Sequence, residues 1–416
     1  MTIKNEHNKI NVPNLRFPEF QGEWEKCKLG ELTTKVGSGS TPKGGNAVYT
    51  SVGHCFVRSQ NVGMGYLILD DIAHIDDDIH KKHKATEINE DDVLLNITGA
   101  SIGRTAIATK EIEGGNVNQH VCIIRTNSKV SPKFLCNYIQ TKKIQNYIQS
   151  LQTGGSREGL NFEQIRSFPI SLPGIAEQSQ IAQLLDKLNE RIATQNKIID
   201  KLQSLIKGIA DNLLDNPLWE KTYLRSFMQF FSTNSLSWEQ LSYEEGEIRN
   251  LHYGLIHGFL TSGINSASLP MVKYGAMPKQ YTLCQVGDVA FADASEDTGE
   301  IAKSVEFVDT IDVETICGLH TIHGRDVKNK TLVGFKGFVF NSRYFHNQIK
   351  RLAQGTKVFS ITANNLSSCY IYLPDIETQK VIVKLLKAYE EQLIVNKSTL
   401  KQYEKQKQYL LRQMFI

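Results

Sequence analysis

The sequence predicts an α+β protein made of two similar globular domains, each built of twisted β-sheets with short helices, and of two long helices. Two observations carry this prediction. Leu172-Pro173 is followed by Glu177-Gln178 and a long apolar-periodic stretch, and Leu373-Pro374 opens a second such stretch 201 residues later. The region before each stretch is rich in β-branched and aromatic residues interrupted by glycine. A repeat of about half the chain is too long for a solenoid and implies pseudo-two-fold symmetry.

Changes in residue composition along the chain set the expected boundaries of the domains and helices. We expect an N-terminal domain over residues 1–175, a central helix over 176–215, a second domain over 216–375 and a C-terminal helix over 376–416. Runs such as Asp92–Thr98 and Val286–Phe291 have the composition of short strands, and Pro132–Ser150 that of short helices. The two domains align only weakly, with Asp92 and Asp288 at corresponding places. The frame therefore repeats while most of the residues inside it differ.

The long stretches have the periodicity of paired helices. Apolar residues recur in alternating steps of four and three from Ile181 to Leu213, which is a heptad seam. At ~1.5 Å per residue the first helix would be about 60 Å long, and a helix of that length needs a partner, so the two helices are expected to pack on each other. Gln195 and Asn396 occupy the same seam position in the two helices, where a polar residue fixes register. The residues expected at this pairing are Ile192, Gln195, Ile199, Leu393, Asn396 and Leu400.

Composition narrows the class of protein. The 22% of charged and 40% of hydrophobic residues are typical of a soluble chain, and no apolar run reaches membrane-spanning length. The polar start MTIKNEHNKI is not a signal peptide, and the seven cysteines include no Cys-x-x-Cys pair. We therefore expect a cytoplasmic protein with reduced thiols and no membrane partner. A net charge of +3 permits nucleic-acid binding only through clustered charge or with a partner.

Motifs for catalysis are incomplete. Asn216-Pro217-Leu218-Trp219 lacks the second proline of the adenine methyltransferase motif, and no glycine-rich cofactor loop follows a strand. Pro374-Asp375 is followed by Glu-x-x-Lys where a nuclease would have Glu-x-Lys. There is also no phosphate-binding Gly-x-x-x-x-Gly-Lys-Ser/Thr loop. We expect no catalytic residues in this chain.

Two histidine-containing motifs are candidate metal sites. They are Cys317-x-x-His320-x-x-His323 and His80-x-x-His83. Neither has a second ligand pair at zinc-finger spacing, and Cys317 and His320 fall in a strand-like run beside apolar residues. Core or groove positions are the expectation for these residues, and no metal is expected.

A series of short motifs follows the chain from about residue 13 to the C-terminus. The motifs are Pro13-Asn-Leu-Arg-Phe-Pro-Glu-Phe20, Trp24-Glu-Lys, Leu29-Gly-Glu-Leu32, Ser38-Gly-Ser-Thr-Pro42, Gly99-Ala-Ser-Ile-Gly-Arg104, Asn118-Gln119, Leu160-Asn161, Ile170-Ser-Leu-Pro173 and Glu177-Gln178. Each motif is loose by itself, but in their order, spacing and duplication they resemble the specificity subunits of type I restriction–modification enzymes.

The resemblance implies a function for each part. Each globular part would be a target recognition domain that reads one half of a gapped sequence in double-stranded DNA. The long helices would pack as an antiparallel coiled coil that sets the gap, and they would dock two modification subunits. Those subunits are adenine-N6 methyltransferases that use S-adenosylmethionine, and two restriction subunits using ATP and Mg²⁺ would join them. The chain itself would be non-catalytic and would bind no cofactor.

Glycine-containing turns with hydroxyl groups or cations are the candidate DNA contacts, because they can hold phosphates or reach base edges. Two of these turns, at residues 153–157 and 354–357, occupy matching places in the repeat, and each carries one cation. A plain solvated turn is the alternative for each candidate. The predicted DNA-binding residues are Ser38, Ser40, Thr41, Lys43, Ser101, Arg104, Ser156, Arg157, His252, Tyr253, Ser295, Glu296, Thr356 and Lys357.

Two other functions stay open at this point. One is a stand-alone DNA-modifying or DNA-cutting enzyme, against which the degraded motifs speak. The other is a coiled-coil scaffold with no role on DNA, which fits poorly with two globular domains of different content. An activity assay of the purified chain would separate the first from a specificity subunit, and a gel shift with partner subunits would separate the second.

Overall fold

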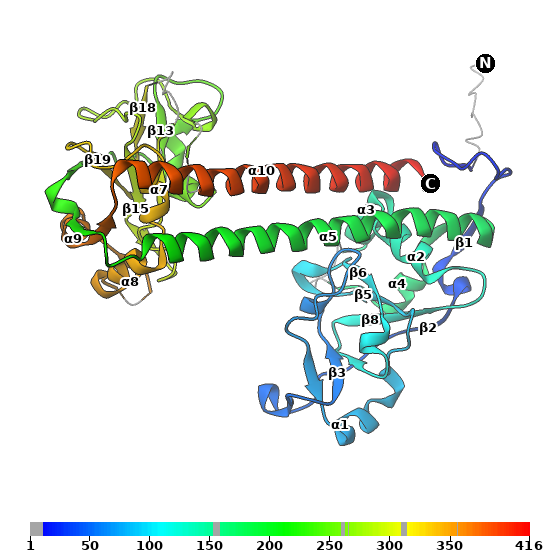
Figure 1. The fold of residues 1–416 in the computed structure, drawn as a ribbon. Helices are drawn as coiled ribbons and strands as arrows, with labels where there is room; N and C mark the ends of the chain where they lie inside the picture. Colours follow the sequence, from blue (N-terminus) through cyan, green and yellow to red (C-terminus); the bar gives the residue numbers. More distant parts are fainter. Residues whose placement is uncertain (1–10, 153–158, 259–262, 265, 309–313, 356) are drawn as a thin grey trace, which may run out of the picture. The chain divides into compact units, whose positions relative to one another are not determined.

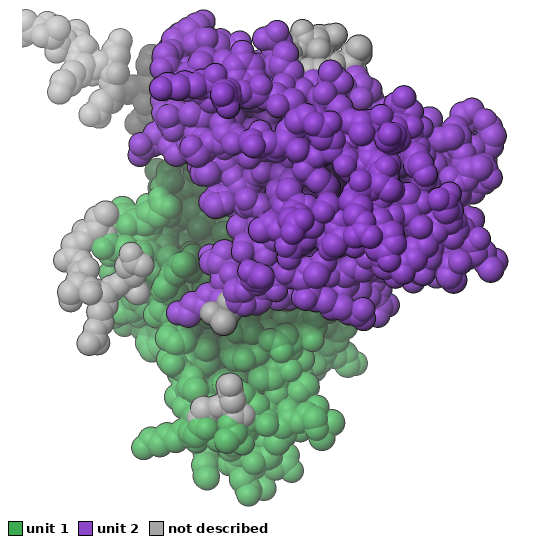
Figure 2. All heavy atoms as spheres, turned by 90° about the vertical axis from the view of Figure 1, so that its left-hand side faces the viewer, with its two compact units in different colours: residues 1–195, 399–416 green, residues 196–398 purple. Residues whose placement is uncertain are grey.

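A computed structural model describes residues 11–152, 159–258, 263–264, 266–308, 314–355 and 357–416. Its longest elements are the helices α5 (Ile175–Leu214) and α10 (Ile376–Gln413), green and red in Figure 1. The chain forms two compact units, coloured separately in Figure 2. Unit 1 is residues 1–195 with 399–416, and unit 2 is residues 196–398. Each long helix therefore contributes one end to each unit.

Unit 1 contains a four-stranded antiparallel sheet in the order β2-β8-β5-β6, a three-stranded sheet β4-β3-β7 and the antiparallel pair β1-β9. In the three-stranded sheet β3 pairs with β4 antiparallel and with β7 parallel. The strands of unit 1 are β1 (Glu25–Lys28), β2 (Thr33–Ser38), β3 (His54–Val57), β4 (Ala73–Ile75), β5 (Val93–Asn96), β6 (Thr105–Ile107), β7 (Asn116–Val117), β8 (Val121–Thr126) and β9 (Pro169–Leu172). Its short helices are α1 (Asp77–Lys82), α2 (Pro132–Ile139), α3 (Lys142–Ser150) and α4 (Phe162–Arg166).

Unit 2 contains the sheets β11-β19-β15-β17 and β12-β14-β13-β18 and the pairs β10-β21 and β16-β20. Its strands are β10 (Glu220–Tyr223), β11 (Met228–Phe231), β12 (Leu241–Ser242), β13 (Arg249–Leu251), β14 (Met271–Val272), β15 (Val289–Ala292), β16 (Ala294–Ser295), β17 (Ser304–Glu306), β18 (Thr315–Cys317), β19 (Thr321–Asp326), β20 (Phe359–Ser360) and β21 (Tyr370–Leu373). Its short helices are α6 (Tyr253–Ile256), α7 (Phe335–Val339), α8 (Arg343–Leu352) and α9 (Ala363–Ser368).

The two units share one topology although their residues have diverged. The sheet β2-β8-β5-β6 of unit 1 corresponds strand by strand to β11-β19-β15-β17 of unit 2, and β4-β3-β7 corresponds to β14-β13-β18. The parallel pairing recurs as well, between β3 and β7 and between β13 and β18. The predicted α+β fold of two similar domains with long helices is confirmed, and the repeat extends into interiors whose residues barely align.

A buried glutamine repeats the same contacts at the start of each long helix. Gln178 and Gln379 are both fully buried. Each accepts a hydrogen bond from a backbone N–H, at 2.8 and 2.7 Å, and donates from its side-chain amide to two backbone carbonyls. The partners are Ser131, Lys129 and Pro173 for Gln178 and Leu332, Lys330 and Pro374 for Gln379. The glutamine therefore ties each helix to the domain that precedes it.

Within each unit, the beginning of one long helix and the end of the other share a hydrophobic core. In unit 1 the core includes Ile181 and Leu185 of α5 and Leu410 and Met414 of α10. In unit 2 it includes the end of α5, at Ala210 and Leu214, and the beginning of α10, at Ile382, Val383 and Leu386. This is the pairing expected of antiparallel helices.

The residues predicted at the helix seam lie at different depths. Gln195, Ile199 and Leu393 are buried, and Ile192 packs against the core of unit 1. Asn396 and Leu400 are half-buried, and the Asn396 amide donates to the Gln392 carbonyl at 2.7 Å, one turn back. The polar seam residue of α10 is thus bonded to its own helix.

All seven cysteines are free thiols. Over the described residues, no helix combines the length and the apolar character that a membrane crossing requires.

Candidate nucleic-acid interface

In unit 1, the glycine-serine loop after β2 lies against the turn between β7 and β8. The Gly39 N–H donates to the Asn118 carbonyl at 3.1 Å, and the Thr41 hydroxyl hydrogen-bonds the Gln119 side chain. A Cβ at Gly39 would stand 1.6 Å from the Val117 carbonyl oxygen, so this approach of two backbones requires glycine. Beyond it, Ser40, Thr41 and Lys43 are exposed, while Ser38 is the half-buried last residue of β2.

The β7–β8 turn carries His120 at the centre of this face. Its ring is hydrogen-bonded to the Thr98 hydroxyl on one side and to the Gln119 amide, at 3.0 Å, on the other. Thr98 in turn pairs through its backbone with Gly159. The Ser38–Lys43 loop, the turn at 118–120 and the segment after β5 therefore form one continuous polar face, called face 1 below.

The Gly99–Arg104 segment extends face 1. The Ser101 hydroxyl accepts a hydrogen bond from the buried Asn96 amide at 3.1 Å, so Ser101 is held in place from below. Arg104 is exposed and directly precedes β6. Gly103, just before Arg104, has a φ of +85°, a left-handed conformation that glycine adopts without strain.

In unit 2, the predicted residues Ser295, Glu296 and Lys357 come from two segments that lie side by side. Strand β16 pairs with β20, so that Ser295 stands opposite Phe359. Glu296 and Lys357 are exposed just outside the two strands. They bring opposite charges to the same edge of unit 2.

An aromatic cluster lies next to this edge. His320, at φ +54°, is hydrogen-bonded to the Asp293 carboxylate at 3.0 Å, and its ring meets the Tyr253 ring edge-on at 5.3 Å. His252 lies between Trp238 and Tyr253, with ring centroids 4.4 and 4.7 Å away. Together with Ser295, Glu296 and Lys357, these residues are called face 2 below.

His252 is a support for face 2 and not part of its surface. Its side chain is 3% exposed and caps α6 by accepting a hydrogen bond from the Gly254 N–H at 3.3 Å. Burial, and then the neighbouring His320, lower the pKa of His252, so the ring is neutral near pH 7. The exposed indole of Trp238 and the half-buried Tyr253 are the groups in this cluster that a ligand can reach.

The two faces share a residue that the sequence interpretation did not single out as a DNA contact. His120 and His320 are 200 residues apart and occupy the same turn of the two units, between β7 and β8 and between β18 and β19. Each is hydrogen-bonded to the segment after the equivalent central strand, at Thr98 or Asp293. The recurrence of this histidine was visible in the sequence repeat, but the periodicity of the strands does not reveal which residue of a turn points outward.

Three of the predicted DNA-binding residues, Ser156, Arg157 and Thr356, lie outside the described residues. Gly159, which follows the first of these segments, pairs with Thr98 of face 1. Gln354, which precedes the other, pairs with Ser360 beside face 2. Gly159 and Gln354 thus adjoin faces 1 and 2, respectively.

A buried aspartate, paired with a partly exposed arginine, supports the central sheet of each unit. Arg125 binds Asp92, and Arg325 binds Asp288, through two hydrogen bonds of 2.8 and 2.7 Å in both units. Burial alone would raise the pKa of Asp288, but hydrogen bonds from Arg325 and His323 outweigh it and lower the pKa. The carboxylate therefore stays ionised and holds the strand ends of β15 and β19 together.

Comparisons with known proteins agree with this architecture. The model of the family described as type I restriction modification DNA specificity domain matches residues 21–204 and 312–405. Two proteins of Methanocaldococcus jannaschii are similar along their whole length. The MjaVIII specificity subunit is 23% identical, with 99% of this chain and 96% of that protein covered. The putative MjaX specificity subunit is 22% identical, with 97% and 96% covered.

Solved structures give the same result for the fold. The S subunit of the type I restriction–modification system from M. genitalium has a TM-score of 0.57 at 14% identity, and the match covers 97% of this chain and 99% of that one. A chain from a study of complex assembly and conformational transition of the type I R-M system has a TM-score of 0.54 at 16% identity, with 93% and 96% covered.

A duplicated domain that carries a polar face, combined with long antiparallel helices, defines the class of two-domain specificity proteins. With more than half of its residues matched by the family model, this chain belongs to the type I restriction modification DNA specificity family. It is accordingly the DNA sequence-recognition subunit of a type I restriction–modification system.

Proposed function

We propose that unit 1 and unit 2 each read one half of a bipartite, gapped DNA sequence through faces 1 and 2, and that the chain performs no chemistry itself. The observation that carries the proposal is that one scaffold presents two different sets of side chains. Thr98 and Gln119 flank His120 in unit 1, whereas Asp293 and Tyr253 flank His320 in unit 2. Two differently equipped faces suit two different half-sequences.

The groups on the faces have the chemistry of base and phosphate recognition. Face 1 offers the Gln119 amide and hydroxyl groups, which can donate to and accept from base edges, and Arg104, which suits guanine or phosphate. Face 2 offers the Glu296 carboxylate, which can accept from a cytosine amino group, and Lys357 for the backbone. The proposed contacts thus differ in kind between the two half-sites.

The partners follow from the same proposal. Two modification subunits would methylate adenine with S-adenosylmethionine, and two restriction subunits would act with ATP and Mg²⁺, all on the DNA that this chain selects. Large aliphatic side chains exposed on the long helices support docking there, because exposed apolar patches on soluble proteins mark protein–protein interaction sites. They include Leu184, Ile198 and Leu205 of α5 and Val381, Leu385 and Ile394 of α10.

Exchange of one domain tests the two-reader proposal. Replacing residues 24–170 with the corresponding region of a relative is expected to change one half of the methylated sequence and leave the other half and the gap as they were. Methylome sequencing of cells that carry the hybrid and its modification partner measures this. The reciprocal exchange in unit 2 is the control and should change only the other half. A change of both halves by either hybrid would contradict the assignment of one reader to each unit.

Removal of a cation that binds a phosphate should appear in the salt dependence of DNA binding. Replacing Arg104 or Lys357 with alanine is expected to weaken DNA binding by the assembled complex and to reduce the slope of log K against log salt by about 0.9 for each phosphate that is no longer neutralised. Lys110, exposed beyond the opposite end of β6, is the matched control and its alanine variant should keep the slope. An unchanged slope for both Arg104→Ala and Lys357→Ala would count against faces 1 and 2.

A further inference from the structure

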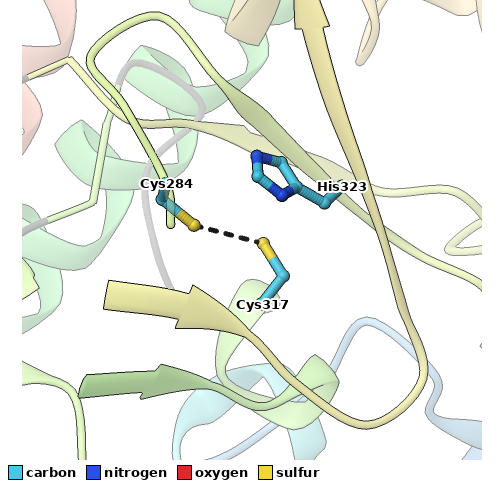
Figure 3. A group of neighbouring side chains, drawn as sticks. All are labelled: Cys284, Cys317 and His323. Atoms are coloured by element: carbon cyan, nitrogen blue, oxygen red, sulfur yellow. Dashed lines mark hydrogen bonds between the residues drawn. The ribbon is translucent and has the colours of Figure 1, made fainter. Parts of the chain in front are cut away.

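Three metal-ligating side chains meet in the interior of unit 2 (Figure 3). Cys284 lies before β15, Cys317 ends β18, and His323 is in β19, and all three are buried. The two sulfur atoms are 3.6 Å apart, and the ligand atoms of the three residues lie within 4.8 Å of one another. The thiols and the imidazole ring point towards a common centre.

The fold does not require this cluster, because unit 1 builds the same positions from aliphatic residues. The Cys284 N–H donates to the carbonyl of Thr315 at 2.8 Å, as the Ile88 N–H does to Gly115 at 2.9 Å. Cys317 and Val117 end the equivalent parallel strands, β18 and β7.

The third position matches in the same way. His323 stands opposite Ala290 of β15, and Ile123 stands opposite Leu94 of β5. In unit 1, Ile88, Val117 and Ile123 belong to one hydrophobic cluster. At the same three positions unit 2 has two thiols and an imidazole, which are ligand types that zinc prefers.

The distances suit a tetrahedral ion. With Zn–S bonds of about 2.3 Å, two thiolates at the tetrahedral angle stand about 3.8 Å apart, close to the 3.6 Å between the sulfurs of Cys284 and Cys317. A disulfide would require about 2.05 Å. Two thiolates and a neutral imidazole around Zn²⁺ have no net charge, which is the form that a buried site favours.

His323 is already oriented as a zinc ligand. Its Nε2 is 2.7 Å from Oδ2 of the buried Asp288, which also binds Arg325. If Nε2–H donates to this carboxylate, Nδ1 is left with its lone pair free for a metal, and a carboxylate behind the histidine is the usual support of zinc sites.

We propose that Cys284, Cys317 and His323 bind one Zn²⁺, with Asp288 positioning the histidine. Binding releases the two thiol protons and leaves the fourth tetrahedral position to water or another small ligand. Cys317 and His323 flank the β18–β19 turn that carries His320 of face 2. The ion would therefore hold this turn against the segment that carries Cys284. An effect of the ion on DNA recognition rests on the proposed function, but the binding of the ion does not depend on it.

Metal content and a cobalt spectrum of the full chain test the proposal without DNA. Reduced protein purified with its modification partner is expected to retain one zinc per chain after dialysis, measured by elemental mass spectrometry. Replacing zinc with Co²⁺ should produce the visible bands of tetrahedral cobalt and a thiolate charge-transfer band. Absence of zinc together with absence of these bands on Co²⁺ titration would overturn the site, as would a Cys284–Cys317 disulfide found by peptide mapping of the purified protein.

Two variants assign the metal to these residues. C284I/C317V/H323I carries the residues that unit 1 uses at the same positions, so it is expected to fold and to lose the zinc and the cobalt bands. Cys369→Ala removes another buried thiol of unit 2 that lies in a different cluster, and it should retain both. The proposed ligands would be contradicted if the folded triple variant retained the metal. They would also be contradicted if Cys369→Ala lost it.

Discussion

Replacing Glu306 with glutamine is expected to destabilise unit 2 by about 3–5 kcal/mol, because it leaves a buried lysine without its counter-charge. Lys336 Nζ is 2.9 Å from Glu306 Oε1, and the two side chains are 2% and 0% exposed. The ammonium also donates to the Thr331 hydroxyl at 3.0 Å, and Glu306 Oε2 accepts a hydrogen bond from the Gly337 N–H at 2.8 Å, which the amide oxygen of glutamine can accept instead. Glutamine retains the shape of the side chain and removes that charge. Urea unfolding followed by circular dichroism measures the loss.

Two companion variants isolate the buried pair. The double variant Glu306→Met with Lys336→Met removes both charges but leaves the Gly337 N–H without its acceptor, so it should recover part of the stability that Glu306→Gln removes. Glu300, whose side chain is 42% exposed, pairs with both Lys303 and His257. Glu300→Gln should cost no more than about 1 kcal/mol, because these pairs lie at the surface. If Glu306→Gln were no more costly than Glu300→Gln, the buried pair would not be a determinant of the stability of unit 2.

The frame of this protein could be predicted from its sequence because the frame depends on local and periodic features. The helices expected over residues 176–215 and 376–416 correspond to α5 (Ile175–Leu214) and α10 (Ile376–Gln413). Gln178 and Gln379 repeat at one offset, and each accepts a hydrogen bond from a backbone N–H 47 residues earlier in the chain. The repeated glutamine was visible in the sequence, whereas its partners are set by the packing of each helix on the domain before it.

The faces and the buried cluster could not be predicted to the same depth, because they depend on which turns meet across the sheets. Cys317 and His323 were visible as a motif, but Cys284 joins them from a separate segment that only the pairing of Leu283 with Ile316 brings near. His252 has the composition of a reading loop and yet is buried as a helix cap. Burial of an individual polar residue is a property of tertiary packing, which the pattern of a single strand does not contain.

Lengthening both long helices is expected to lengthen the gap in the recognised DNA sequence. Inserting four residues after Ile199 in α5 and four after Leu400, at the equivalent place in α10, keeps the antiparallel pair matched. Each insertion adds about 6 Å of rise and about 40° of net rotation, and a coiled coil can absorb this phase slip by local unwinding. Both half-sequences should persist, and methylation of the original sequence should disappear.

The size of the change makes this test quantitative. At about 3.4 Å per base along one strand, 6 Å corresponds to one or two added base pairs. Insertion of a whole heptad in each helix, about 10.5 Å of rise, should add about three. The exchange Ile199→Leu with Leu400→Ile alters the same places without changing length and should leave the methylome unchanged. If active insertion variants kept the original gap, α5 and α10 would serve as a docking platform for partners and not as the element that sets the distance between the two half-sites.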